Sequence, residues 1–534
     1  MMNASSVFEK VCLAFANPAF YPHPVFGIER LDTHISAVFL TGQWVYKLKK
    51  SVDFGFLDFR TLEARKYFCE MEILLNRRLS QDIYDAAVPV YMDADGRISL
   101  EPKGNVVEYA VRMKQLSDER CMATMLLDDR VSAGQLADLG KFLADFYARS
   151  ERNPEIDAFG SIEKVGFNVE ENFQQVAPYV EGLLNPQRWE HICKTSRTFL
   201  RGHRNLFQKR IRAGRICDGH GDLRTEHVYF QDGIQILDCI EFNDRFRYGD
   251  VAVDLAFLHM DMEYRGYSEK SQELLCAYVD PADDPQLYAV LDFYSAYRAV
   301  VRLKVSCFTL DGLNPEAAAS LKKVISRYQD LAYEYALRFS RPTLWVFCGL
   351  PATGKSSLAQ EVQSILDITW LQSDKIRRQE LSQAPDVTAY GQGIYRPESR
   401  DLIYRRLLEE AGTCLKSGRS VIVDATFSRS RWRENAFQIA RESESDILFV
   451  ECRCSEDEIV HRLRQREITQ GLSDARLQHL PDMIREFEPM ETIEEQHRIT
   501  IDAQGAVSQT VHQIVAQGYD RKCARIKQLE KNPA

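Results

Sequence analysis

The sequence predicts two parts of different fold class. Residues 1–340 predict an α+β part with a small β lobe and a helical large lobe, and residues 341–534 predict an α/β part with a parallel sheet. In the first part, strand-like segments give way to a mostly helical pattern after residue 130. In the second part, strand and helix patterns alternate throughout, which is typical of a parallel sheet covered on both faces.

The strands of the first part come early in the chain. Four short runs are rich in strand-forming residues: 37–40, 44–48, 87–91 and 106–113. The helical region ends with two patterns of helical period, at 289–310 and 315–340. Pro342 then disfavours a helical conformation at the residue before it, and the strand formers 344–348 follow at once. We therefore place the main domain boundary at 340/341.

Composition excludes several classes of protein. The chain has 534 residues, of which 45% are hydrophobic and 27% are charged, so it is an ordinary globular sequence that is long enough for more than one core. Its net charge of −10 gives no general attraction to nucleic acid or to an anionic membrane. The 13 cysteines include no C-x-x-C pair, so no zinc site is expected. No secretory signal and no apolar run of about 18 residues is present, so we expect a cytoplasmic protein without a membrane partner. The sequence does not predict the oligomeric state.

A phosphate-binding motif opens the second part. Residues 349–356 spell Gly-Leu-Pro-Ala-Thr-Gly-Lys-Ser, a full G-x-x-x-x-G-K-[ST] loop between an expected strand and an expected helix. The glycines let the backbone wrap closely around phosphate, and the N–H groups at the helix start face the anion. The candidate nucleotide-binding residues are Gly349, Gly354, Lys355, Ser356 and Ser357. Among them, Lys355 is expected to reach the β- and γ-phosphates, and Ser356 is expected to bind Mg²⁺.

Two carboxylates follow later strands of this part. Asp424 ends the apolar run 420–424, where a carboxylate usually supports the Mg²⁺ ion. Asp374 follows another expected strand, and its carboxylate is suited to accept the proton of a substrate hydroxyl. Arg377, one turn later, is suited to hold an anionic substrate. The alternative is that Asp374 caps a helix and that Arg377 is solvated.

Arginines near the end of this part suggest a lid. Arg462 and Arg466 are at i and i+4 on the helix expected after strand 447–452. The segment 470–475 follows as a candidate mobile lid, and lid arginines of this kind close over a transferring phosphate. The alternative is an exposed basic helix face.

The second part resembles small P-loop (AAA-type) kinases of the polynucleotide-kinase and zeta-toxin type, over about 341–515. The resemblance rests on motifs in a fixed order: the phosphate loop, Ser-Asp-x-x-Arg at 373–377, Val-Asp-Ala-Thr at 423–426, Trp432-Arg433 and the arginine-bearing lid. It implies that Asp374 is the general base, Asp424 the carboxylate near Mg²⁺ and Arg466 a clamp on the transition state. Such kinases phosphorylate hydroxyls of nucleic-acid ends, sugars, sugar nucleotides or antibiotics, so the acceptor stays open.

A second group of catalytic candidates lies in the first part. His220-Gly221-Asp222 matches the start of the H-x-D-x-x-x-x-N pattern of kinase catalytic loops. The runs 228–230 and 234–238 follow, joined by an Asp-Gly turn, which predicts a hairpin with Asp238 at its end. We expect Asp222 to act as the base for an acceptor hydroxyl and Asp238 to bind Mg²⁺.

The first part resembles the aminoglycoside-phosphotransferase and choline-kinase branch of the protein-kinase-like fold, over roughly 25–335. It is most similar to a bacterial family that fuses such a domain to a P-loop kinase. The match also includes the segments 33–36, 45–50, 68–72, 109–113 and 240–244. The resemblance implies that Lys47 is the strand lysine that pairs with ATP phosphates. Glu72 is then its helix partner, with Glu70 as the alternative.

The same resemblance implies an adenine hinge near 112–115 and a buried Asp254 that braces the catalytic loop. One position departs from the pattern, because His227 stands where such kinases have asparagine. An imidazole is a poorer Mg²⁺ ligand than an amide oxygen, so the second metal ion and turnover of this site are open. Residues 53–55 spell the kinase metal triplet Asp-Phe-Gly, but they lie just past the strand 44–48, and we expect a loop there rather than a metal site.

Together these observations predict an ATP-dependent phosphotransferase with two ATP·Mg²⁺ sites and a small-molecule hydroxyl acceptor. In one alternative, the first part is a nucleotide-binding sensor that regulates its neighbour. In a second alternative, the second part phosphorylates the 5′-hydroxyl of a polynucleotide or acts as a toxin-like kinase. An NTP-driven remodelling ATPase is a third alternative, for which the sequence shows no sensor elements.

Overall fold

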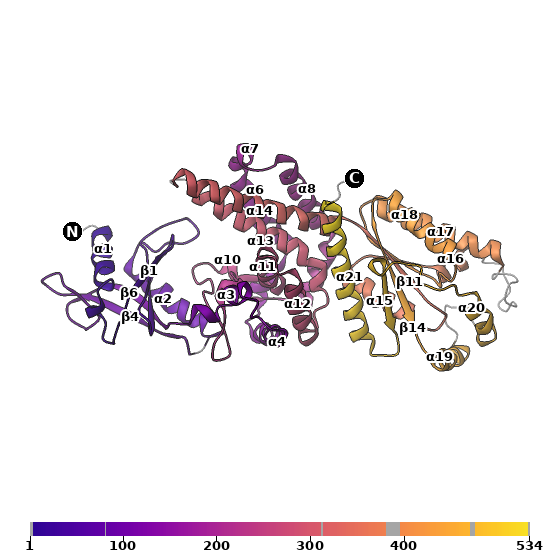
Figure 1. The fold of residues 1–534 in the computed structure, drawn as a ribbon, viewed down its shortest axis with the longest axis horizontal. Helices are drawn as coiled ribbons and strands as arrows, with labels where there is room; N and C mark the ends of the chain where they lie inside the picture. The colour runs from indigo at the N-terminus through magenta and orange to yellow at the C-terminus, as the bar shows by residue number, and fades with distance from the viewer. Residues whose placement is uncertain (1–3, 81, 311–312, 381–395, 470–475, 532–534) are drawn as a thin grey trace. The chain divides into compact units, whose positions relative to one another are not determined.

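The computed structural model describes residues 4–80, 82–310, 313–380, 396–469 and 476–531, except for the side chains of 4–6, 466–469 and 530–531. The chain divides into two compact units. The first consists of the residues up to Lys164 together with Arg210–Ala282, and the second of Val165–Lys209 together with the residues from Asp283 onward. Both predicted fold classes are confirmed: the first unit holds an antiparallel sheet and helices, and the second holds a parallel sheet (Figure 1).

The predicted boundary at 340/341 falls between a helix that ends at Ser340 and a strand that begins at Thr343. It stays a prediction about domains, because the compact units follow a different division. The helices between residues 283 and 340 pack in the same unit as the parallel sheet.

A six-stranded antiparallel sheet forms the small lobe of the first unit. Its spatial order is β1-β2-β3-β6-β4-β5. The strands are β1 (Glu29–Asp32), β2 (Ser36–Leu40), β3 (Trp44–Lys49), β4 (Tyr84–Met92), β5 (Ile98–Ser99) and β6 (Asn105–Lys114). Helices α1 (Ala4–Phe15) and α2 (Leu62–Asn76) pack against this sheet.

The alternation of side chains along β3 decides what reaches the site. Tyr46 and Leu48 point to one face and join the core that includes Phe15 of α1. Val45 points to the other face and joins the core that includes Ile73 of α2. Lys47 and Lys49 share the parity of Val45, so both lysines face α2.

The helical part of the first unit carries the catalytic-loop motif. Its helices are α3 (Met122–Leu127), α4 (Ala133–Arg149), α5 (Pro154–Asp157), α10 (Asp244–Arg247), α11 (Val251–Tyr264) and α12 (Ser268–Ala282). Strand β7 (Ile216–Asp218) pairs with β10 (Tyr248–Asp250). The predicted hairpin is present, because β8 (Val228–Phe230) pairs antiparallel with β9 (Ile234–Ile236). The Asp-Phe-Gly triplet 53–55 lies in the loop after β3, as expected.

Several helices precede the sheet of the second unit in sequence. They are α7 (Val180–Leu183), α8 (Pro186–Gly202), α13 (Leu287–Thr309) and α14 (Pro315–Ser340); α6 (Ile162–Val176) and α9 (Arg204–Arg212) each run across the limit between the units. The patterns at 289–310 and 315–340 therefore form the helices that the sequence predicts.

The five-stranded sheet of the second unit is parallel throughout, with the order β12-β13-β11-β14-β15. Its strands are β11 (Thr343–Cys348), β12 (Thr369–Gln372), β13 (Val421–Asp424), β14 (Asp446–Arg453) and β15 (Arg498–Asp502). The helices are α15 (Lys355–Leu366), α16 (Ser373–Glu380), α17 (Pro397–Lys416), α18 (Ser430–Glu442), α19 (Glu456–Thr469), α20 (Leu480–Glu486) and α21 (Val507–Lys531). Strand β11 is central, and the chain order reverses at its end, which is where α/β sheets bind ligands.

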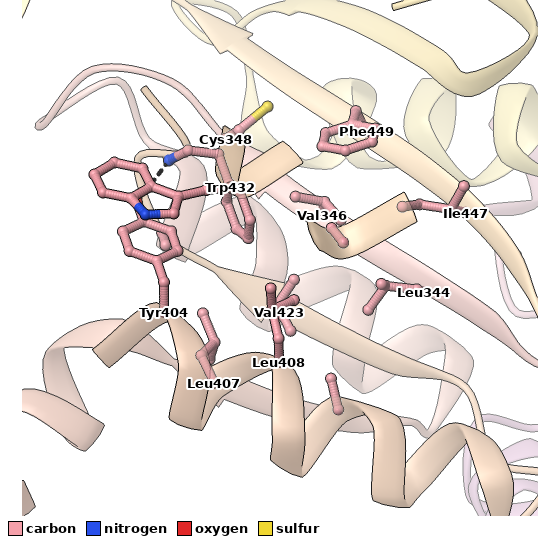
Figure 2. Packing of buried hydrophobic residues seen from close by; sticks show 14 of the residues in the cluster. Leu344, Val346, Cys348, Tyr404, Leu407, Leu408, Val423, Trp432, Ile447 and Phe449 are labelled. Atoms are coloured by element: carbon pink, nitrogen blue, oxygen red, sulfur yellow. Dashed lines mark hydrogen bonds between the residues drawn. The ribbon is translucent and has the colours of Figure 1, made fainter. Parts of the chain in front are cut away.

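Both faces of β11 are buried. Leu344 and Val346 pack with α17 and α18, where the ring of Trp432 stacks on Tyr404 at 4.0 Å between centroids (Figure 2). Trp345 points to the opposite face, where α21 passes so closely that a Cβ at Gly518 would lie 2.2 Å from the indole. Helices therefore cover the sheet on both sides (Figure 1). None of the described helices is both long and apolar enough to cross a membrane.

Candidate active sites

In the first unit, Lys47 lies between two carboxylates. Its Nζ is 2.9 Å from Oε1 of Glu72 on α2 and 2.6 Å from Oδ1 of Asp238 after β9. Glu70, the alternative partner, is exposed and lies 3.8 Å from Lys66 on its own helix. The geometry therefore pairs Lys47 with Glu72, while its role toward ATP stays a prediction.

Asp238 presents an ionised oxygen to the site. Burial would raise the pKa of its carboxyl, but the Lys47 ammonium and the His227 ring outweigh burial and hold that pKa below its ordinary value. The side chain is 48% exposed, so an oxygen is accessible to a ligand. Mg²⁺ prefers such oxygen donors, and Asp238 fits the predicted ligand role.

Asp254 of α11 braces the catalytic loop as the resemblance implied. Its two carboxylate oxygens accept hydrogen bonds from the backbone N–H groups of His220, at 2.7 Å, and Gly221, at 2.9 Å. The His220 ring contacts the carbonyl oxygen of Leu237 at 2.9 Å, and burial lowers the pKa of this imidazole to about 4. A neutral His220 therefore ties the catalytic loop to the segment that carries Asp238.

Asp222 has a partner that the sequence did not predict. The buried guanidinium of Arg224 donates two hydrogen bonds to the Asp222 carboxylate, at 3.0 and 2.8 Å. Nδ1 of His227 lies 2.8 Å from the Asp222 carbonyl oxygen, which can only accept, so Nδ1 carries the proton. Nε2 of His227 lies 3.8 Å from Oδ2 of Asp238. The histidine therefore binds the backbone of Asp222 and lies near Asp238, at the position where the H-x-D-x-x-x-x-N pattern has asparagine.

In the second unit, the phosphate loop adopts conformations that require small residues. Gly349 has a φ of +136° and Gly354 a φ of +92°, and a Cβ on Gly349 would lie 2.4 Å from the carbonyl oxygen of Cys452. Lys355 Nζ donates to the carbonyl oxygen of Leu350 at 3.3 Å. Because α15 begins at Lys355, its free N–H groups open toward the loop. Ser357 lies exposed in the first turn of this helix.

Asp424 meets the phosphate loop through neighbouring strands. It is buried at the end of β13, in register with Phe347 of β11. Burial raises the pKa of its carboxyl, and the Lys355 ammonium and a hydrogen bond from Ser356 partly offset that rise. A carboxylate beside a serine hydroxyl at the start of a phosphate loop is a donor set that fits Mg²⁺.

Asp374 belongs to the same site. Gln372 at the end of β12 pairs with Asp424 at the end of β13, and Asp374 follows Gln372 by two residues. The negative charge of Asp374 contributes to the raised pKa of Asp424. Asp374 lies inside the first turn of α16 rather than at its N-cap, and Nη1 of Arg377 is 2.7 Å from its Oδ1. The alternative, in which Asp374 caps the helix and Arg377 is solvated, does not fit, because Arg377 is paired with Asp374. The general-base role stays a prediction.

The arginines of the expected lid differ in what can be described. Arg462 of α19 donates to the carbonyl oxygens of Ala352, at 3.3 Å, and Ala503, at 3.1 Å, so it supports the phosphate loop. The side chain of Arg466 and the whole of 470–475 lie outside the described residues, and the proposed clamp and lid stay predictions.

Other motif residues serve the core. Trp432 is buried against Tyr404 (Figure 2). Arg433 is buried and donates to the carbonyl oxygens of Phe427 and Glu488. All 13 cysteines are free thiols. Among the described residues, no group of three or more His, Cys, Asp or Glu side chains is placed to hold a metal ion.

Comparisons with known proteins agree with this geometry. A family described as an AAA domain matches residues 344–490, which include the phosphate loop, Asp374 and Asp424. The uncharacterized proteins Rv2004c of Mycobacterium tuberculosis and Mb2027c of Mycobacterium bovis are each 32% identical over 464 residues, which cover 85% of this chain and 89% of the relative. The chain belongs to the family of these mycobacterial proteins.

Solved structures each match a portion of the chain. A choline/ethanolamine kinase family protein from Mesorhizobium loti is 14% identical and covers 61% of this chain and 99% of its own, with a TM-score of 0.34. A gluconokinase from Sinorhizobium meliloti 1021 is 17% identical and covers 36% of this chain and 98% of its own, with a TM-score of 0.27.

Proposed function

We propose that the chain is an ATP-dependent phosphotransferase that transfers the γ-phosphoryl group to a hydroxyl of a small-molecule acceptor. One observation carries the proposal: in the second unit, the phosphate loop with Lys355 and Ser356 meets two carboxylates, Asp424 and Asp374, at the end of a parallel sheet. The AAA-domain match to this region supports it.

The residues of this site have distinct roles in the proposal. Lys355 and the N-terminus of α15 bind the phosphates, and Ser356 and Asp424 hold Mg²⁺, which neutralises phosphoryl charge when bound. Asp374 accepts the proton of the acceptor hydroxyl, while Arg377 keeps its carboxylate in place.

The first unit supplies a second site of the same kind. Lys47 and Glu72 are paired, Asp238 offers a metal ligand, and the catalytic loop with Asp222 is braced by Asp254. With both sites active, the chain is bifunctional.

Transfer from γ-labelled ATP tests the proposal. Purified protein is incubated with Mg²⁺ and a panel of sugars, nucleosides, aminoglycosides and a 5′-hydroxyl oligonucleotide, beside the variants Lys355→Ala and Asp222→Asn. We expect label on one acceptor class and its loss in one variant, which assigns the reaction to a unit. Normal phosphorylation by a folded Lys355→Ala protein would remove the assignment to the second unit.

A second candidate function has its own observation. Arg224 occupies both oxygens of Asp222, and His227 replaces the asparagine of the pattern, which favours a first unit that binds nucleotide without turnover. Single-turnover transfer by full-length Lys355→Ala protein would count against this sensor. The full chain is needed, because a truncation at 340 would separate α13 and α14 from α21, with which they pack.

A polynucleotide acceptor is the remaining alternative for the second unit. The chain's net charge of −10 gives no general attraction to a polyanion, and this favours a small-molecule acceptor instead. Oligonucleotide binding that weakens steeply with salt would favour the polynucleotide reading, and indifference to nucleic acid would favour a small acceptor.

A further inference from the structure

A second lysine lies deeper in the first unit than Lys47. Lys49 follows two residues later on the same face of β3, and its side chain has no exposed surface. Its Nζ lies 2.7 Å from Oε2 of Glu72 and also binds Oε1 of Glu241, whose side chain is 5% exposed. The Phe59 ring covers the same ammonium, at 5.1 Å from its centroid.

Glu72 is therefore shared between two cations. One of its oxygens faces Lys47 and the other faces Lys49. Lys47 pairs with both Glu72 and Asp238, and its side chain is partly exposed. The side chain of Lys49, in contrast, has no exposed surface. Lys49 can therefore keep Glu72 in place through Oε2 even if Lys47 leaves Oε1 to bind nucleotide.

Lys49 also reaches the segment that carries the candidate metal ligand. Glu241 comes three residues after Asp238, so the bond to Glu241 fixes the chain just beyond it. One buried ammonium thus connects β3, α2 and the segment 238–241, the three elements that carry Lys47, Glu72 and Asp238. Lysines are almost never fully buried without a partner, and this one has two.

We propose that Lys49 is a positioning residue that holds Glu72 and the Asp238 segment in their nucleotide-ready arrangement before nucleotide binds. The first-unit site is then preassembled, and α2 does not swing between two positions. This inference rests on the proposed function of that site as a nucleotide site.

The test uses full-length protein with Lys355→Ala in all variants, so that nucleotide effects report on the first unit. Hydrogen exchange of peptides from α2 and from 238–247 is followed with and without a non-hydrolysable ATP analogue. In the parent protein we expect α2 exchange to be the same with and without the analogue. In Lys49→Met we expect exchange at least about tenfold faster without analogue, largely restored when analogue is added, and weaker analogue binding. Lys49→Arg keeps the cation and is expected to retain part of the protection.

Two further variants separate positioning from simple charge balance. Lys49→Met/Glu241→Gln removes one charge of each sign and so keeps the buried charges balanced. If this double variant is stable but its α2 exchange still depends on nucleotide, the result supports a positioning role for Lys49. Lys47→Met is expected to weaken analogue binding and leave α2 protected, since Lys49 still holds Glu72. The inference is overturned if Lys49→Met leaves α2 exchange unchanged, or if the double variant regains both parental exchange and parental affinity.

Failure of this inference can be told apart from failure of the proposed nucleotide-binding function of the first unit. If the parent protein binds no analogue in the first unit, the nucleotide site is refuted. The anchoring by Lys49 is still decided by α2 exchange in analogue-free Lys49→Met against the parent.

Discussion

Replacing Gly349 by alanine adds one methyl group where the phosphate loop leaves β11. The residue has a φ of +136°, which L residues rarely adopt, and holding one there costs about 1–3 kcal/mol. The new Cβ would also lie 2.4 Å from the carbonyl oxygen of Cys452. That oxygen belongs to the backbone of β14, which is paired with β11 on one side and β15 on the other, so it cannot move aside as a side chain would. The loop itself has to shift.

A shifted loop carries the N–H groups at the start of α15 away from the bound phosphates. If the shift weakens the free energy of nucleotide binding by about 2–3 kcal/mol, nucleotide affinity falls about 30- to 140-fold. The assay is titration with a non-hydrolysable ATP analogue in a Lys47→Met background, so that only the second unit responds. Gly418→Ala is the matched control, because Gly418 has a φ of +78° with no atom within 4 Å of an added Cβ. We expect Gly418→Ala to bind normally; normal binding by Gly349→Ala, or equal weakening in both, would refute the reasoning.

Three further predictions concern single residues. Asp254→Asn places an amide N–H against a backbone N–H of the catalytic loop, so analogue binding to the first unit in a Lys355→Ala background should weaken at least about tenfold; unchanged affinity contradicts the bracing role. His227→Asn restores an amide oxygen beside Asp238, so less Mn²⁺ should be needed to half-saturate analogue binding in the same background; an unchanged requirement shows that the histidine does not limit metal binding. Trp432→Ala removes a ring that is buried against Tyr404 and should lower the free energy of unfolding by about 3–5 kcal/mol in urea titrations; a loss below about 1 kcal/mol contradicts a core role.

The second-unit site could be predicted largely because local sequence patterns specify each of its groups. Eight consecutive residues specify the phosphate loop, and each carboxylate follows a strand of the same parallel sheet. The carboxyl ends of parallel strands meet at one edge of the sheet. That Asp374 and Asp424 lie together could therefore be predicted without knowing how the side chains pack.

The first-unit site depends more on tertiary packing. Glu70 and Glu72 are two residues apart on one helix, and only the docking of α2 onto the sheet decides which one faces Lys47. Arg224 and Glu241 were missed because their roles come from partners brought near by folding. The available signal was their spacing, two residues after Asp222 and three after Asp238.

Packing also decided where the long helices belong. The periodicity of 289–310 and 315–340 predicted helices but not the surface that they cover. In the structure, Asp292 of α13 accepts a hydrogen bond from Tyr519 of α21 at 2.8 Å, a contact between residues 227 positions apart. No local pattern encodes such a pairing, so the compact units differ from a division drawn along the sequence.

The central claim is that one chain carries two ATP sites. Equilibrium binding of a labelled, non-hydrolysable ATP analogue with Mg²⁺ measures it directly. We expect two analogue molecules per wild-type chain, one in Lys355→Ala, one in Lys47→Met and none in the double variant. A wild-type chain that binds one molecule, or a folded Lys355→Ala protein that still binds two, would contradict it.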